Sequence, residues 1–200
     1  MGSKERDPDA LPGAVVTVAG FCMDVTEVTA GAYAACVRSG RCSVDGLQCA
    51  RGTYGVSGKE DHPINCVDWG QAVTYCNAVG KRLPTDDEWE YTARGGVNGW
   101  DYPWGNAEPD FQLCWSKPTM VGGTCTVGRF PEGNNPWGVQ DLAGNVWEWM
   151  SSVSDDFPFR TLRGGSWSDS VPSDVRATTR KFSKPSSRSN FVGFRCARTP

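Results

Sequence analysis

The sequence contains a single histidine, His62, among 200 residues, and this scarcity excludes most imidazole chemistry. Zinc sites and histidine-activated nucleophiles usually need one or two well-placed imidazoles. Long apolar runs are also missing, so we expect no membrane span. A net charge of −3 gives no indication of a basic surface that would bind nucleic acid. We also expect a monomer.

Glycine and proline are abundant instead, with 24 and 13 copies, and tryptophan and cysteine occur nine times each. This composition predicts one loop-rich globular domain over residues 14–200, preceded by a polar lead-in over residues 1–13. Capping residues and glycines predict three helices: one capped by Thr26 or Thr29 and ending at Gly40, one from Asp68 to Gly80, and one from the Thr85/Glu88 capping box to Gly95.

Short strands are expected near both ends of the domain. Apolar alternation predicts two short strands, or one bent strand, within residues 15–25, and further strands at 161–164, 175–180 and 192–197. Residues 95–165 are mostly glycine, proline, tryptophan, asparagine and aspartate, with no strong period. We expect that stretch to be ordered only through tryptophans and bound ions.

The nine cysteines show no Cys-x-x-Cys spacing, which argues against a zinc ribbon or a thioredoxin-like redox pair. Their number and density predict four disulfides and one spare thiol in an exported, oxidised protein. We therefore expect an extracytoplasmic location, either periplasmic or secreted. The alternative is a cytosolic protein with several buried free cysteines.

Six blocks of sequence follow one another along the chain: Thr26-Glu-Val-Thr, Lys81-Arg-Leu-Pro-Thr-Asp-Asp-Glu-Trp-Glu-Tyr, Tyr102-Pro-Trp-Gly-Asn, Asn135-Pro-Trp-Gly-Val-Gln-Asp-Leu-Ala-Gly-Asn-Val-Trp-Glu-Trp, Leu162-Arg-Gly-Gly-Ser-Trp and Gly193-Phe-Arg-Cys-Ala. Together they resemble the formylglycine-generating enzyme or sulfatase-modifying factor family, over about residues 14–198. The resemblance implies an α+β fold, a C-type-lectin-like variant with little regular secondary structure.

Active members of that family oxidise a substrate cysteine to formylglycine with copper and oxygen. Two cysteines shortly after the Arg-Gly-Gly-Ser motif hold the copper, and thiolates suit Cu(I). This chain has no cysteine between Cys125 and Cys196, and Asp169 and Asp174 lie near the missing positions. Hard carboxylates are poor Cu(I) ligands, so we assign no catalytic residue and expect no copper.

The resemblance also implies one calcium site, in the segment from Asp141 to Glu148. Those two residues would supply side-chain oxygens, and Gly144 and Val146 would supply carbonyls. Two carboxylates and an asparagine around a glycine turn also suit calcium on chemical grounds. In the alternative interpretation, Asp141 and Asn145 only cap turns and Glu148 pairs with an arginine.

Cys76 and Cys196 match the positions of a disulfide that the resemblance implies. Cys114 and Cys125 lie 11 residues apart, and we expect them to bond as well. One sequence leaves the pairing of the other five open: Cys22, Cys36, Cys42, Cys49 and Cys66.

By resemblance, the serine-rich segment 166–190 faces a ligand. Small hydroxyls and arginines suit a peptide, a protein or a glycan, although a solvated loop has the same composition. The tryptophans are more typical of a core than of a sugar-stacking platform, and the arginines of the segment could instead pair with Glu148 or Asp141. The candidate ligand-binding residues are Ser166, Trp167, Asp169, Asp174, Arg176 and Arg180, with Trp167 the best stacking candidate.

The leading hypothesis is a non-catalytic, calcium-stabilised domain of this family that binds a peptide, protein or glycan. The alternative is a copper- and oxygen-dependent oxidase of sulfatase cysteines with altered ligands, such as Cys114 or Cys125. A purely structural domain of a larger chain is the third possibility. Copper uptake with oxygen consumption would favour the oxidase, and calcium-dependent stability without copper would favour the first hypothesis.

Overall fold

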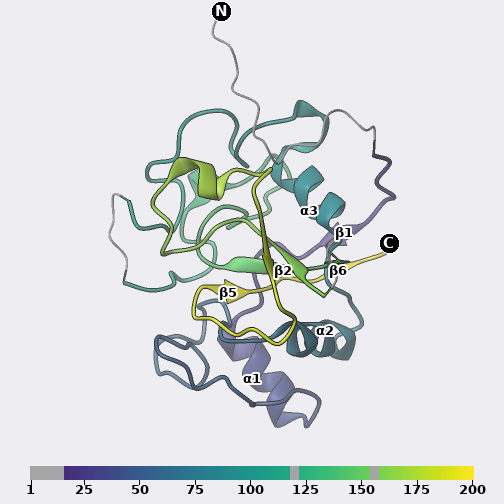
Figure 1. Cartoon of the computed structure of the whole chain (residues 1–200), viewed down its shortest axis with the longest axis vertical. Coiled ribbons are helices and arrows are strands. Elements are labelled where there is room, and N and C mark those ends of the chain that lie inside the picture. The colour runs from purple at the N-terminus through teal and green to yellow at the C-terminus, as the bar shows by residue number, and fades with distance from the viewer. Residues whose placement is uncertain (1–15, 118–121, 154–157) are drawn as a thin grey trace, which may run out of the picture.

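The computed structural model describes residues 16–117, 122–153 and 158–200, and the predicted lead-in over residues 1–13 lies outside them. Three helices and two small sheets are joined by long loops (Figure 1). The helices are α1 (Ala30–Arg38), α2 (Trp69–Ala78) and α3 (Asp86–Ala93), with 3-10 turns η1 (Gly96–Asn98), η2 (Pro131–Gly133) and η3 (Pro172–Val175). The strands are β1 (Cys22–Met23), β2 (Trp147–Val153), β3 (Arg160–Arg163), β4 (Arg180–Ser183), β5 (Val192–Gly193) and β6 (Ala197–Arg198).

All three predicted helices are confirmed, and each begins where a side chain caps free backbone N–H groups. Thr29, rather than Thr26, caps α1, because its hydroxyl accepts a hydrogen bond from the N–H of Ala32 at 3.1 Å. Asp68 caps α2, and Thr85 caps α3 in a reciprocal capping box. These caps set the direction in which each helix leaves its loop.

Strand β2 is the centre of the larger sheet, whose strand order is β4-β3-β2-β5, with β2 and β5 parallel. Trp147 and Trp149 belong to the buried cluster that includes α1 and α2, whereas Met150 belongs to the cluster around Trp89 of α3. Figure 1 shows α1 and α2 on one side of the β2–β5 pair and α3 on the other. Both faces of β2 are therefore covered.

Several strand predictions need correction. The sequence favours irregular structure at residues 147–153, but they form the longest strand among the described residues, and its first four residues are buried on both faces. The predicted strand at 175–180 is wrong: its first residue ends η3, and β4 begins only at Arg180. Within residues 16–25, only β1 is a strand, and it pairs with β6.

Four disulfides and one free thiol are present, as predicted. The expected Cys76–Cys196 and Cys114–Cys125 pairs are confirmed, with Cα–Cα distances of 5.7 and 6.0 Å. The first closes a loop of 120 residues, and chain entropy gives such a loop about 5 kcal/mol of stabilisation. The structure resolves the open pairings as Cys36–Cys42 and Cys49–Cys66, and leaves Cys22 free and exposed.

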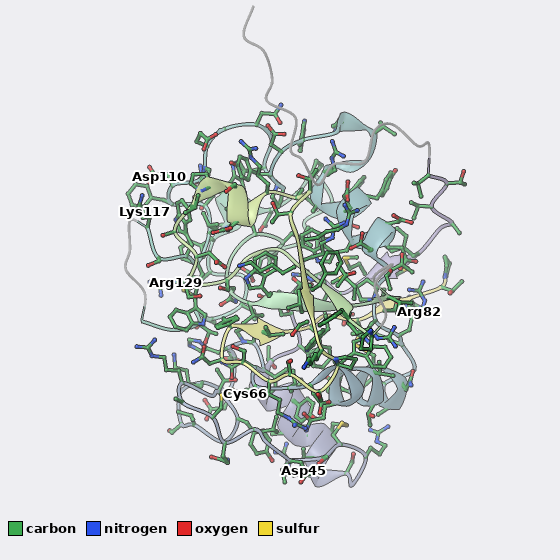
Figure 2. All side chains as sticks on the ribbon, in the orientation of Figure 1. Asp45, Cys66, Arg82, Asp110, Lys117 and Arg129 are labelled. Atoms are coloured by element: carbon green, nitrogen blue, oxygen red, sulfur yellow. A yellow bond between two sulfur atoms is a disulfide. The ribbon has the colours of Figure 1, made fainter. Side chains whose placement is uncertain are left out.

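Loops make up most of the described residues between 95 and 146, and buried side chains hold them together. Tyr102, Leu113 and Trp115 form a separate buried cluster there. Figure 2, which draws the described side chains, shows Asp110, Lys117 and Arg129 along this loop-rich edge of the molecule. Among the described residues, no helix has the length and apolar character needed to cross a bilayer.

Candidate functional site

The Arg-Gly-Gly-Ser motif follows β3 and makes a sharp turn into the interior. Gly164 and Gly165 both adopt positive φ, at 98° and 78°, where other residues are strained. A Cβ at Gly165 would also lie 2.6 Å from a methyl carbon of Val175. The turn delivers Ser166 to a fully buried position.

Asp169 closes this turn through what we call the Asp169 cluster, which also contains Ser166, Trp147 and Lys181. Its Oδ2 accepts hydrogen bonds from the backbone N–H and the hydroxyl of Ser166 and from the indole N–H of Trp147, each at 2.8 Å. The ammonium group of Lys181 lies 3.4 Å from Oδ1 and 4.3 Å from the centroid of the Trp147 ring. The carboxylate is thus held by four donors within the protein.

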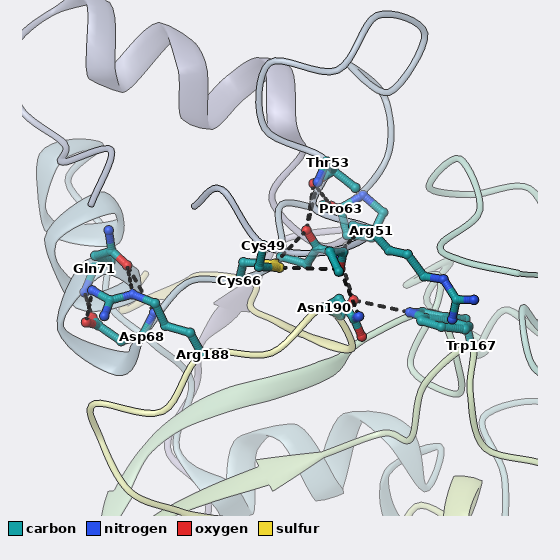
Figure 3. Close-up of a disulfide and its surroundings, with 12 residues drawn as sticks. Cys49, Arg51, Thr53, Pro63, Cys66, Asp68, Gln71, Trp167, Arg188 and Asn190 are labelled. Atoms are coloured by element: carbon teal, nitrogen blue, oxygen red, sulfur yellow. Dashed lines mark hydrogen bonds and ion pairs between the residues drawn. A yellow bond between two sulfur atoms is a disulfide. The ribbon is translucent and has the colours of Figure 1, made fainter. Parts of the chain in front are cut away.

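Trp167 points into the fold and is 6% exposed. Its indole N–H donates to the carbonyl of Asn190 at 3.2 Å, and the guanidinium of Arg51 lies 5.2 Å from its ring centroid. The amide of Asn65 donates to the same Asn190 carbonyl at 2.7 Å. Figure 3 shows these contacts beside the Cys49–Cys66 disulfide, with Arg51 over the Trp167 ring.

The arginines predicted to bind a ligand contact residues outside the Asp169 cluster. Arg180 forms ion pairs with Asp86 and Glu90, each at 2.8 Å, so the alternative of a structural pair holds with different acids from those expected. The half-buried Arg176 lies beside Tyr102, whose hydroxyl helps to raise the pKa of the guanidinium. Asp174 lies in η3 and is half-buried. The six candidates therefore do not form one cluster.

The predicted calcium segment forms a tight turn next to β2. Asp141, Gly144 and Asn145 all have positive φ, between 54° and 80°, a conformation that aspartate and asparagine tolerate better than most residues. The carboxylate of Asp141 accepts the N–H of Gly128, and the side-chain oxygen of Asn145 accepts the N–H of Cys125 at 3.0 Å. The capping roles of the alternative interpretation are thus present.

Glu148 is fully buried and forms an ion pair with Arg195. The guanidinium donates to both carboxylate oxygens, at 2.8 and 2.9 Å, and the indole N–H of Trp89 donates at 3.0 Å. Three hydrogen bonds leave room for one further ligand on a carboxylate, which has about four lone-pair sites. Burial nevertheless raises the pKa of Glu148.

Glu27 completes this buried acidic centre, and the sequence analysis missed its role. Its side chain is 2% exposed, and neither carboxylate oxygen receives a hydrogen bond from a described residue. Burial raises the pKa of Glu27 well above its usual range, and the nearby charges of Asp141 and Glu148 raise it further. The available signal was an acid directly before the apolar Val28, within the Thr26-Glu-Val-Thr block.

The carboxylate oxygens of this centre suit a hard cation, but the side chains alone provide too few ligands. Glu27, Asp141 and Glu148 carry three ionisable carboxyl groups, and Arg195 supplies one positive charge. No three His, Cys, Asp or Glu side chains among the described residues are grouped closely enough to hold a metal by themselves. A bound calcium would therefore need backbone carbonyls too, as expected for Gly144 and Val146.

A small mixed sheet, peripheral helices and long disulfide-stapled loops define a C-type-lectin-like domain of the formylglycine-generating-enzyme type. The family model described as the sulfatase-modifying factor enzyme 1-like domain matches residues 1–200, and the chain belongs to that family.

Two curated relatives illustrate the range of this family. The chain is 41% identical to the bovine "Inactive C-alpha-formylglycine-generating enzyme 2", over 72% of this chain and 52% of that protein. It is 36% identical to the mouse "Formylglycine-generating enzyme", over 70% of this chain and 45% of that protein. The chain thus spans about half the length of these relatives.

Solved structures with the same fold cover more of the chain. PvdO from Pseudomonas aeruginosa superposes with a TM-score of 0.78 and 27% identity, over 98% of this chain and 87% of that one. Treponema denticola variable protein 1 superposes with a TM-score of 0.71 and 22% identity, over 90% of this chain and 84% of that one. The second likeness concerns the fold alone.

Proposed function

We propose that the chain is a non-catalytic, extracytoplasmic domain of this family that binds a peptide, protein or glycan and is stabilised by one calcium ion. The non-catalytic part of the proposal rests on the disulfide bonding of the cysteines. Eight of the nine cysteines are in disulfides, Cys22 lies on the small β1–β6 sheet, and Asp169 after the Arg-Gly-Gly-Ser motif is held by internal donors. Copper oxidation of a cysteine needs soft ligands that this loop lacks.

The similarity to a relative named as inactive supports the same conclusion. The oxidase alternative loses its candidate ligands, because Cys114 and Cys125 are bonded to each other. Four disulfides support an oxidising compartment.

Absence of oxidase activity is tested by incubating the protein with Cu(I), oxygen and a peptide containing the sulfatase cysteine motif. We expect no aldehyde in the peptide by mass spectrometry and no oxygen uptake above that of a reaction without protein. Formation of formylglycine at a rate proportional to protein concentration would overturn the proposal.

The calcium part of the proposal rests on the buried acidic centre. The cation would be held by Asp141, Glu148 and the carbonyls of Gly144 and Val146, and it would offset the excess negative charge next to Glu27. When bound, calcium supplies a structural cross-link and no redox chemistry. Binding to the folded state alone raises stability by about 2.7 kcal/mol at one hundred times the dissociation constant.

Thermal unfolding with calcium and with chelator tests this part. We expect calcium to raise the melting temperature of the native protein, and Glu148→Gln to abolish the increment. Glu60→Gln, at an exposed acid, is the matched control and should keep it. An equal calcium response in both variants would refute the assignment of Glu148.

A further inference from the structure

One tryptophan differs from the rest in its exposure. Trp137 is 55% exposed, whereas the other eight tryptophans are buried or half-buried. Seven of those eight donate their indole N–H to an acceptor within the protein, and Trp167, the stacking candidate from the sequence, is among them. Single exposed apolar side chains are common in folded proteins, so what distinguishes Trp137 is how its ring is held and what surrounds it.

The ring of Trp137 is nonetheless fixed in place. It stacks on Tyr91 of α3 with 5.8 Å between ring centroids and 18° between ring planes. The side-chain oxygen of Asn135 accepts the N–H groups of Trp137 and Val139, at 3.0 and 2.9 Å. The amide of Asn135 donates to the carbonyl of Thr92 at 2.9 Å, which fastens the loop to α3.

Glycine and exposed apolar groups complete the surface around the two rings. Gly96 has a φ of 69°, and a Cβ there would lie 2.9 Å from Trp137 and 3.2 Å from the hydroxyl of Tyr91. Val97 follows it and is 95% exposed, and Pro136 precedes Trp137 and is also exposed. We call Tyr91, Gly96, Val97, Pro136 and Trp137 the aromatic platform.

The size of the platform selects among occupants. A stable protein interface takes about 20 to 30 residues on each side, which far exceeds this group. The face of one or two sugar rings has the right dimensions, and its C–H groups pack well against a flat aromatic ring. A ring that is already held in position loses little conformational freedom on binding.

The charges nearby select the kind of sugar. Asp87 lies one helical turn before Tyr91 on α3, on the same exposed face, and offers oxygens to sugar hydroxyls. Arg94, at the end of α3, already donates to Glu90 at 3.1 Å and to the carbonyl of Gly99 at 3.3 Å. In the described part of the chain, an anionic sugar on this face would therefore meet the Asp87 carboxylate, while Arg94 is already paired.

We propose that the aromatic platform binds a neutral saccharide, with a pyranose ring stacked on Trp137. This inference rests on the proposed binding function and names its ligand class and its surface.

Cellohexaose is a suitable neutral probe and hexagalacturonic acid is the matched anionic one. Tryptophan fluorescence and isothermal titration of the full chain should detect cellohexaose binding at concentrations up to about 10 mM, and weaker or no binding of the acidic sugar. Trp137→Ala should lower the association constant at least about tenfold, and Trp137→Phe should retain part of it. Phe182→Ala is the control, because Phe182 is 56% exposed on β4, outside the platform.

The melting temperatures of the variants separate loss of binding from loss of fold, and we expect Trp137→Ala to melt close to the native protein. No cellohexaose binding at that concentration would overturn the inference, as would binding that Trp137→Ala leaves unchanged. Self-association that this variant abolishes, seen by sedimentation, would instead assign the platform to a second copy of the chain. Formylglycine formation would overturn the proposed function itself, which makes the two failures distinguishable.

Discussion

Substitution of Asp86 provides the sharpest test of how α3 is fixed to the sheet. Asp86 is the first residue of α3, and its two oxygens accept hydrogen bonds from Arg163 at 2.6 Å each and from Arg180 at 2.8 Å. Glu90 accepts from the same two arginines at 2.7 and 2.8 Å. Arg94 is a third guanidinium on Glu90, at 3.1 Å, so the two carboxylates hold three arginines, and the side chain of Arg163 has no exposure.

Asp86→Asn keeps the shape of the side chain and removes one negative charge, which leaves both guanidiniums against Glu90 alone. Breaking a fully buried ion pair costs about 3 to 5 kcal/mol. Because the side chain of Asp86 is 14% exposed, we expect a loss of about 2 to 4 kcal/mol in the free energy of unfolding. Asp87→Asn, at the exposed neighbour, should change it by less than about 0.5 kcal/mol.

The pH dependence of this loss tests the electrostatic cause. Burial opposes ionisation of Asp86, but Arg163 and Arg180 outweigh burial and lower its pKa. A carboxylate with a lowered folded-state pKa stabilises the fold above its unfolded pKa of about 3.9, and this contribution is lost as the pH falls through the folded-state pKa. Urea unfolding should therefore show a full difference between native protein and Asp86→Asn at pH 7, shrinking below about pH 4. A difference below about 0.5 kcal/mol at pH 7, or one independent of pH, would refute the reasoning.

Three further substitutions test other parts of the structure. Asp169→Ala should lower the free energy of unfolding by about 2 to 3 kcal/mol in urea, because it leaves the buried indole N–H of Trp147 without an acceptor; an unchanged midpoint would contradict this. Gly165→Ala should cost more than about 2 kcal/mol in the same assay, because φ is 78° and the new Cβ would meet Val175 at 2.6 Å; a loss below about 1 kcal/mol would contradict the strain. Cys22→Ser should lower the thiol count under denaturing conditions from one to zero and leave the melting curve unchanged; a remaining thiol would show incomplete pairing elsewhere.

The helices were predictable because their signals are local. The side chains of Thr29, Asp68 and Thr85 each accept a hydrogen bond from the backbone N–H three positions further on, so a short window of sequence contains the whole interaction. The choice between Thr26 and Thr29 required the structure, since Thr26 donates its hydroxyl to the carbonyl of Glu27 instead.

Strand β2 could not be predicted in the same way, because it pairs both with β3, the next strand along the chain, and with β5 from a distant segment. Trp147 and Glu148 pair with residues of β5, and Glu148 and Trp149 pair with residues of β3. The Cys49–Cys66 disulfide also depends on which loops meet, whereas Cys36–Cys42 joins α1 to the turn that follows it. Composition and spacing do not contain that information.

The exposure of the candidate ligand residues could not be predicted from the sequence either. A serine- and arginine-rich segment has the composition of a binding surface and equally of a polar network within the fold. Here Arg180 is paired with two acids, and Ser166 and Trp167 are buried. Exposure of Trp137, in contrast, follows from the way its loop is fastened to α3 by Asn135.

The internal hydrogen bonds of these residues affect where a ligand can bind. At the Asp169 cluster a ligand would compete with the hydrogen bonds that Asp169 Oδ2 already accepts from Ser166 and Trp147, so new hydrogen bonds to that oxygen bring a smaller net gain. At Trp137 a ligand would cover an exposed ring and displace only water, so burial of that apolar surface is a net gain. The proposed binding role is therefore expected at the aromatic platform rather than at the Asp169 cluster.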